Sequence, residues 1–143
     1  MSAPILAPAA MLVLWSMVVL FWVMGTRMPA FKQAGVNLAE SPPGGRYQDV
    51  QDAMPERVNW KSHNYTHLME QPTLFYAVVV VLAVAGDTSV LNTNLAWASC
   101  GLRVLHSLWQ GLFNTIPVRV LLFLLSSLCL LALAINAVRL TVF

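Results

Sequence analysis

Two histidines and a glutamate are spaced to share one side of a helix at the edge of an apolar segment. His63, His67 and Glu70 stand at i, i+4 and i+7 in the stretch RVNWKSHNYTHLMEQPTLFYAVVVVLAVAG, residues 57–86. On an α-helix this spacing places them on one face. Ionisable side chains are costly near hydrocarbon, so their presence there indicates a functional site.

A second polar set follows in the next apolar segment. Arg103, His106 and Gln110 are at i, i+3 and i+7, again one helical face, and Arg119 lies one turn inside the last apolar segment. At about 1.5 Å of rise per residue, Glu70 reaches the same half of the membrane as this set. Together these residues suit a polar, anionic ligand that carries an ammonium group, bound beside an opening to lipid.

Each of these residues also has a purely structural interpretation. Glu70 and Arg103 can form a buried ion pair that fixes helix packing. His106 can be a core histidine, and Arg119 can anchor its helix by extending to the headgroups. His63 and His67 can be ordinary residues of the membrane interface, and Asn114 can simply cap or shape its turn.

A metal site is a weaker alternative. His63, His67, Glu70 and His106 have the donor types that a transition metal prefers. However, a histidine pair at i, i+4 is a weak motif, and no HExxH sequence accompanies it. The sequence therefore favours a site without a metal.

The composition indicates a protein dissolved in lipid. Hydrophobic residues make up 58% of the 143 residues and charged residues only 10%, against roughly 25% charged in soluble domains. A net charge of +2 without a basic run argues against a nucleic-acid partner. The two cysteines, Cys100 and Cys129, both fall in apolar segments, which predicts buried free thiols.

Four apolar segments are long enough to span a bilayer, which takes about 20 residues each. They are residues 5–24, 68–85, 91–113 and 118–140. The first has no basic residues before it, so we interpret it as a retained helix and not as a signal peptide. We expect one membrane domain that comprises residues 1–143.

The connections predict the topology. A polar loop of about residues 26–55 contains the helix-breaking run ESPPGGRYQD. The other connections are the short turns GDTS (86–89) and NTIP (114–117), where Pro117 suits the first turn of a helix. Short turns join antiparallel neighbours, so the predicted fold is an all-α, integral membrane, four-helix up-down bundle.

The positive charges predict an orientation. Most basic residues cluster around the loop of residues 26–55 or beside the 114–117 turn: Arg27, Lys32, Arg46, Arg57, Lys61 and Arg119. The positive-inside rule places that loop and the 114–117 turn in the cytoplasm. Arg139, near the opposite end, weakly opposes this orientation.

Two long stretches resemble the MAPEG family, the membrane-associated proteins of eicosanoid and glutathione metabolism. They are NYTHLMEQPTLFYAVVVVLAVAGD and LAWASCGLRVLHSLWQGLFNTIPVRVLLFL. The resemblance covers roughly residues 57–140 and is closest to a little-characterised bacterial branch, while the first span and loop have the family's layout. The joint spacing is its most specific feature: Glu70, Arg103, His106, Pro117 and Arg119.

The resemblance implies a trimer of four-helix bundles in the bacterial inner membrane, with glutathione bound between neighbouring subunits near the cytoplasmic face. By this resemblance, Glu70 would contact the amine end of glutathione, and Arg103 and His106 would lie in its pocket. Arg119 would stabilise the thiolate as the catalytic residue. Arg27 would be a further arginine near the ligand.

The chain departs from the family pattern at several positions. His67 stands where many members have an asparagine, and Gln110 stands where several have a tyrosine; both remain candidate glutathione contacts. Val120 replaces a serine that prostaglandin E synthase-like members carry. The sequence WKSHNYT replaces the basic run before Glu70. Glutathione binding is therefore expected, and eicosanoid synthesis is not supported.

Two functions follow as expectations. The first is a glutathione-dependent transferase or peroxidase whose lipophilic electrophile arrives through the bilayer between subunits. The alternative is a non-enzymatic MAPEG-fold protein that binds a lipid or quinone, or that serves as an accessory subunit of a larger membrane complex. The departures at His67, Gln110 and Val120 favour the alternative.

Overall fold

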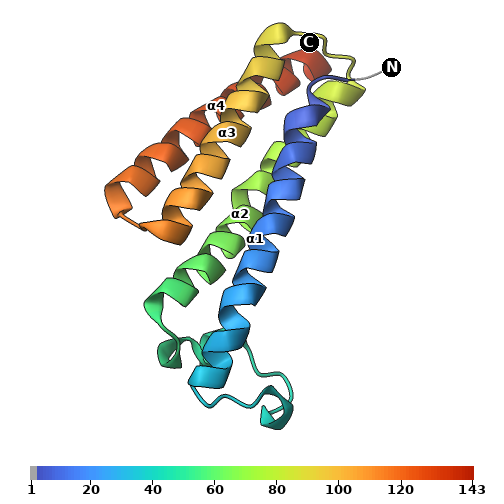
Figure 1. The fold of residues 1–143 in the computed structure, drawn as a ribbon. Helices are drawn as coiled ribbons and strands as arrows, with labels where there is room; N and C mark the ends of the chain where they lie inside the picture. The colour runs from blue at the N-terminus through green and yellow to red at the C-terminus, as the bar shows by residue number, and fades with distance from the viewer. Residues whose placement is uncertain (1–2) are drawn as a thin grey trace.

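The computed structural model describes residues 3–143, which form four long helices (Figure 1). No strand occurs in this part of the chain. The helices are α1 (Leu6–Gln33), α2 (Glu56–Val84), α3 (Val90–Leu112) and α4 (Ile116–Val142). The loop between α1 and α2 contains three short 3₁₀ turns: η1 (Leu38–Glu40), η2 (Tyr47–Asp49) and η3 (Gln51–Ala53).

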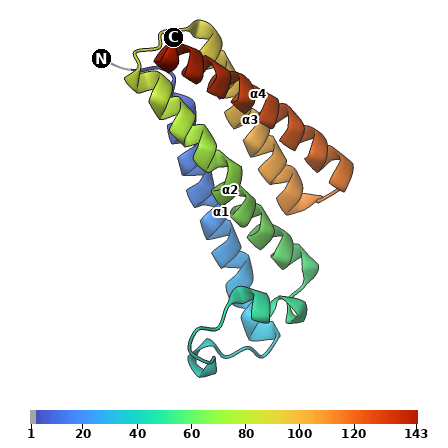
Figure 2. The ribbon, with the colours of Figure 1, turned by 180° about the vertical axis from the view of Figure 1, so that it is seen from behind.

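Consecutive helices run antiparallel, which confirms the predicted up-down bundle (Figures 1 and 2). Helix α1 packs against α2 and α3, and α4 packs against α3 and α2. The described start of α1, the α2–α3 turn and the end of α4 lie together at one end of the molecule. At the other end, α1 and α2 extend beyond the α3–α4 turn and carry the long loop.

The first helix is longer than the sequence predicts. The loop expected from residue 26 begins only at Ala34, because α1 continues through Pro29. A proline removes one backbone hydrogen bond, and helices in lipid often tolerate that loss. The helix ends where Gly35 adopts a φ of 68° and the Val36 amide donates to the Phe31 carbonyl, as in a glycine-terminated helix.

The α2–α3 turn is held by a chain of amide contacts. The Asp87 carboxylate accepts hydrogen bonds from the backbone N–H of Ser89 at 3.2 Å and from Asn92 Nδ2 at 3.0 Å. Asn136 Nδ2 then donates to Asn92 Oδ1 at 2.6 Å. This series of hydrogen bonds connects the α2–α3 turn to both α3 and α4. It therefore helps to fix the position of α2 relative to α3 and α4 at this end.

Helix α3 turns its polar side inward. Arg103, His106 and Gln110 are buried, whereas Leu91 and Leu105, which lie outside this face, are 63% and 55% exposed. This is the reverse of a helix in a water-soluble bundle, where the apolar stripe faces the core. The pattern is that of a bundle whose surrounding solvent is hydrocarbon.

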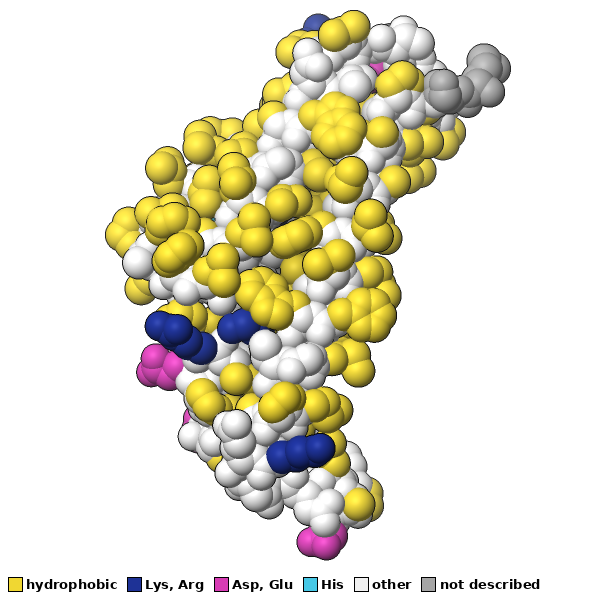
Figure 3. All heavy atoms as spheres, in the orientation of Figure 1, with side chains coloured by type: hydrophobic (Ala, Val, Ile, Leu, Met, Phe, Trp, Pro, Cys, Tyr) yellow, Lys and Arg dark blue, Asp and Glu magenta, His cyan; other side chains and the backbone are white. Residues whose placement is uncertain are grey.

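The outer surface agrees with that environment. Helices α1, α2 and α4 are each long and apolar enough to cross a membrane. Helix α3 is not in that group, because its buried face carries so many polar residues. Hydrophobic side chains cover the length of the helices on the face in Figure 3, and most charged side chains lie toward the loop end. Both cysteines are free thiols, as predicted, but Cys100 is buried whereas Cys129 is only partly buried.

Two apolar clusters hold the helices together. The main core lies between the four helices and includes Leu12, Val19, Phe75, Leu82 and Leu133. A smaller cluster at the loop end joins α1 to the loop: Ala30, Phe31 and Met54, with Val36, Tyr47, Val50 and Val58 against them. The loop is therefore packed against the end of α1 and the start of α2.

The Trp22 side chain of α1 packs directly against Gly111 of α3, which gives a test of the packing. A methyl group at Gly111 would stand 2.6 Å from Cη2 of Trp22, whereas one at Gly101 would meet nothing within 4 Å. We expect Gly111→Ala to lower the free energy of unfolding by about 1–3 kcal/mol through overpacking. The matched control Gly101→Ala should be neutral or slightly stabilising, because alanine favours helix. Thermal unfolding in mild detergent measures both, and equal midpoints would contradict this packing.

Candidate functional site

Most of the site residues that the sequence predicts lie toward the loop end of the bundle. Around them are two cavities of about 380 Å³ each. One, which we call the α2–α4 cavity, is lined by His67, His106, Ile116, Arg119, Val120 and Phe123. The other, which we call the loop cavity, is lined by residues that include Arg27, Tyr47, Ser62, His63, His67 and Glu70.

Three rings form the wall of the α2–α4 cavity. The centroids of His67 and His106 are 5.6 Å apart in an edge-to-face arrangement, and Phe123 lies 6.2 Å from His67 and 6.5 Å from His106. The remaining wall is aliphatic apart from Arg119. The cavity thus places a guanidinium and two imidazoles in mainly apolar surroundings.

The α3–α4 turn holds Arg119 in place. Asn114 adopts a left-handed φ of 56°, and its Oδ1 accepts a hydrogen bond from Arg119 Nη1 at 2.7 Å. Asparagine adopts this backbone conformation more readily than most residues. Asn114 therefore shapes the turn, as expected, and its side chain also positions Arg119.

Arg27 forms one side of the loop cavity. Its guanidinium lies over the Tyr47 ring, with Cζ 3.7 Å from the centroid, and Nη2 donates to Ser62 Oγ at 2.7 Å. The Tyr47 hydroxyl in turn donates to the side chain of Asn59 on α2. Arg27 thus links α1, the loop and α2, and it faces the same cavity as Glu70.

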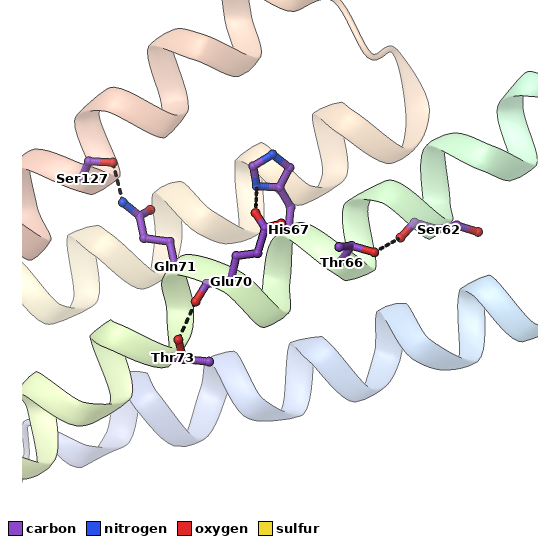
Figure 4. A network of polar contacts seen from close by, with 7 residues as sticks. All are labelled: Ser62, Thr66, His67, Glu70, Gln71, Thr73 and Ser127. Carbon is purple, nitrogen blue, oxygen red and sulfur yellow. Dashed lines mark hydrogen bonds and ion pairs between the residues drawn. The ribbon is translucent and has the colours of Figure 1, made fainter. Parts of the chain in front are cut away.

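Glu70 pairs with His67 and not with Arg103. Its Oε2 lies 3.4 Å from His67 Nδ1 (Figure 4), and its side chain is 61% exposed. The atoms are close, but they are not aligned as a hydrogen bond. Among residues 3–143 the other ion pair is Arg46–Asp49, so the buried Glu70–Arg103 pair considered from the sequence does not form.

Arg103 and Gln110 lie deeper than their predicted role implies. Arg103 is 3% exposed and Gln110 1% exposed, and neither lines the two cavities. Arg103 sits behind the cavity wall, with Cζ 5.1 Å from the Phe123 ring. Of the predicted site residues, the structure brings His67, His106 and Arg119 to one cavity and Arg27, His67 and Glu70 to the other.

Three guanidiniums in this region retain an unused donor. Arg27 Nε, Arg103 Nη2 and Arg119 Nε are inaccessible to solvent and have no hydrogen-bond partner within the described chain. Unpaired buried donors of a charged group are unfavourable. Glu70 is the one carboxylate that lines either cavity. The region therefore has an excess of positive charge that suits an anionic ligand.

The structure shows no assembled metal site in residues 3–143, since no three His, Cys, Asp or Glu side chains come together. The donor set that the sequence offers is divided between the cavities. His63 lines only the loop cavity, and His106 lines only the α2–α4 cavity.

Sequence reasoning missed the residues that support the site. Phe123 is four residues after Arg119, so helical spacing could have drawn attention to it. Ser62 is five residues before His67, a spacing that does not share a helical face, so it could not be found in this way. Tyr47 lies in the loop, where no periodic pattern predicts a contact with Arg27. Gln71 Nε2, which donates to Ser127 Oγ at 2.7 Å and joins α2 to α4 (Figure 4), was likewise unpredicted.

Comparison with known proteins identifies the family. The sequence model of the MAPEG family matches residues 5–139 of the 143-residue chain. The chain belongs to the MAPEG family. The match includes α1, α2 and α3, α4 as far as residue 139, and every predicted site residue. No curated protein and no solved structure matches the chain significantly.

MAPEG membership agrees with the geometry of this region. The family is generally associated with glutathione, whose two carboxylates are the kind of partner that the unused guanidinium donors lack. Its ammonium group has a potential partner in the exposed Glu70 carboxylate. The residues present therefore fit glutathione in charge.

The contact between Asn114 and Arg119 can be tested with two variants. Asn114→Gly keeps the left-handed backbone but removes the hydrogen bond, which should cost about 1.5–3 kcal/mol if the bond is as strong as others to charged groups. Asn114→Ala loses the bond and also strains the backbone by about another 1–2 kcal/mol. Thermal unfolding in detergent should rank wild type above Asn114→Gly and Asn114→Gly above Asn114→Ala. Equal midpoints for the two variants would show that φ at this position is relaxed in solution.

Proposed function

We propose that this protein is a membrane-embedded, glutathione-dependent transferase or peroxidase that acts on lipophilic electrophiles. The observation that carries the proposal is a set of three guanidiniums with unused buried donors. Arg27 and Arg119 each line one of two adjoining cavities, and Arg103 lies behind the Phe123 wall. Membership of the MAPEG family supports the choice of glutathione as the anion.

The charges divide the roles among the residues. Arg27 and Arg103 would attract the carboxylates of glutathione, and Glu70 would attract its ammonium group. His106 and Gln110 would complete the polar surroundings of the bound peptide. Because Arg103 and Gln110 are buried behind the cavity wall, their contribution would be the field and position they impose on the wall.

Arg119 would activate the sulfur. A thiol with a pKa of about 8.5 is mostly protonated at neutral pH. A guanidinium beside the sulfur favours the thiolate, and a lowering of the thiol pKa by two units corresponds to about 2.7 kcal/mol. The thiolate would then attack an electrophilic carbon, and the leaving group would depart with the bonding electron pair.

The lipophilic substrate would enter from the membrane through the α2–α4 cavity. Ile116 and Val120 line this cavity and are 69% and 49% exposed on the outside of the bundle. In a bilayer that exposed surface would face acyl chains or a neighbouring subunit. An apolar electrophile could therefore reach Arg119 without crossing water.

The same proposal includes the assembly and orientation of the protein. We infer a homotrimer in a bacterial inner membrane, with the loop and the α3–α4 turn on the cytoplasmic side. The concentration of basic residues near the loop end supports this orientation. Glutathione would then enter the loop cavity from the cytoplasm. The chain would act as one membrane domain over residues 1–143.

A lipid-binding protein without catalysis is the second candidate. A cavity of about 460 Å³ lies between α1 and α3 and is lined by apolar residues that include Trp15, Trp97, Gly101 and Leu105. This wall suits an acyl chain or quinone. A quinone or lipid that copurifies in stoichiometric amount, without glutathione-dependent turnover, would favour this candidate or an accessory role in a larger membrane complex.

Removal of the Arg119 charge tests the proposed activation. We expect the wild-type protein in mild detergent to bind glutathione saturably in a calorimetric titration and to raise the ultraviolet absorbance of the thiolate. Arg119→Leu should still bind but should lose the thiolate signal, because the charge that stabilises sulfur is gone. Arg119→Lys, which retains a positive charge, should keep part of the signal.

Two outcomes of this experiment would contradict parts of the proposal. A wild-type protein that does not bind glutathione at millimolar concentration would remove the transferase proposal. An Arg119→Leu variant with an unchanged thiolate signal would remove Arg119 from its catalytic role and leave glutathione binding intact.

A further inference from the structure

We propose that His67 and Glu70 form a catalytic dyad in which His67 accepts the proton of the bound thiol. This inference rests on the proposed glutathione-dependent function and assigns the step that Arg119 alone does not perform. A guanidinium stabilises a thiolate, but it is already protonated and cannot take up the proton. Without a base nearby the proton must leave to water, whereas an acceptor beside the sulfur would take it directly.

His67 is placed between the two cavities. It is the one residue that lines both the loop cavity and the α2–α4 cavity. A peptide bound in the loop cavity that extends its thiol toward Arg119 would therefore pass the imidazole. His106 lines only the α2–α4 cavity and His63 only the loop cavity, so neither of the other histidines shares this position.

Glu70 orients the imidazole from one side. Its Oε2 lies 3.4 Å from Nδ1, and Figure 4 shows Nε2 on the opposite side of the ring, away from Glu70. When Nδ1 carries the proton and donates to the carboxylate, Nε2 has a free lone pair. A base held by a carboxylate in this way recurs in enzymes that activate a nucleophile. The present contact is not yet aligned, and the exposed Glu70 side chain is free to turn when a substrate binds.

The charges around the ring explain why the carboxylate is needed. Glu70 on α2 is the anion that touches His67, and the groups that face it from α3 and α4 are His106, Arg103 and Arg119. The two guanidiniums oppose the positive charge that the imidazole gains when it is protonated. The Glu70 carboxylate offsets them as His67 takes up the proton. Arg119 would thus stabilise the thiolate, and the Glu70–His67 pair would hold the proton.

The step balances without a further reactant. The thiol S–H bond breaks, the proton moves to Nε2 of His67, and the electron pair stays on sulfur. The thiolate then forms a C–S bond with the electrophile, and the bond to the leaving group breaks with its electron pair on that group. His67 finally returns its proton to the leaving group or to water, which restores the neutral imidazole.

The experiment measures pH profiles with glutathione and 1-chloro-2,4-dinitrobenzene, whose chloride leaves as the C–S bond forms. We expect His67→Asn to lower kcat/KM by about 10²-fold or more, the usual contribution of a general base. Its remaining activity should rise with the ionisation of the thiol itself, so the profile moves to higher pH. Glu70→Gln should show a smaller loss in kcat and also weaker glutathione binding.

Two controls separate catalysis from structure. His63→Asn changes the same residue type one turn earlier, in the loop cavity. It should keep the wild-type pH profile of kcat at saturating glutathione, because its effect should be confined to the KM for glutathione. His67→Ala should regain at least about tenfold in rate when free imidazole is added, since an external base can then accept the proton. Thermal midpoints within a few degrees of wild type show that the variants are folded.

The outcomes distinguish this inference from the proposed function. If the wild-type protein turns over and His67→Asn keeps its rate and pH profile, the dyad is wrong while the transferase remains. An active wild type whose His67→Ala variant is not helped by imidazole also overturns the dyad. A wild type with neither glutathione binding nor turnover overturns both.

Discussion

Hydrocarbon cannot accept or donate hydrogen bonds, and this constraint determines how the helices of this protein face one another. Every polar side chain within a span must find a partner inside the bundle or reach one of its ends. Helix α3 shows the consequence most clearly, since it buries Arg103, His106 and Gln110 and exposes leucines. The apolar outer surface and the polar interior follow from the same cause. The donors that remain unpaired inside are then the places where a ligand would contribute most.

The site arises where two pairs of helices end at different levels. Helices α1 and α2 project beyond the α3–α4 turn, so the bundle opens there into two cavities that adjoin at His67 (Figures 1 and 2). The loop side offers polar groups and Arg27, and the α4 side offers an apolar wall and Arg119. A reaction between a charged peptide and a lipophilic compound requires both environments in contact. Membership of the MAPEG family places this arrangement among proteins of the membrane.

Much of this architecture could be predicted from the sequence, because helical periodicity identifies spans and the residues that share a face. The four helices, the short turns and the inward position of His106 all follow from spacing within one segment. Contacts between different segments were harder to predict from the sequence. Glu70 pairs with its neighbour His67 and not with Arg103, because the rotation of α2 about its axis depends on packing that spacing does not specify. The continuation of α1 through Pro29 was missed for a related reason, since local propensity in lipid differs from that in water.

The stacking of Arg27 on Tyr47 connects the long loop to the interior of the bundle. Tyr47 also packs in the small apolar cluster with Phe31 and Met54. A ligand that draws the guanidinium toward its own carboxylate would compete with the aromatic ring for the same cation. The position of the loop would then depend on occupancy of the cavity. In this respect the Arg27 side chain would couple the position of the loop to the presence of a ligand inside the bundle.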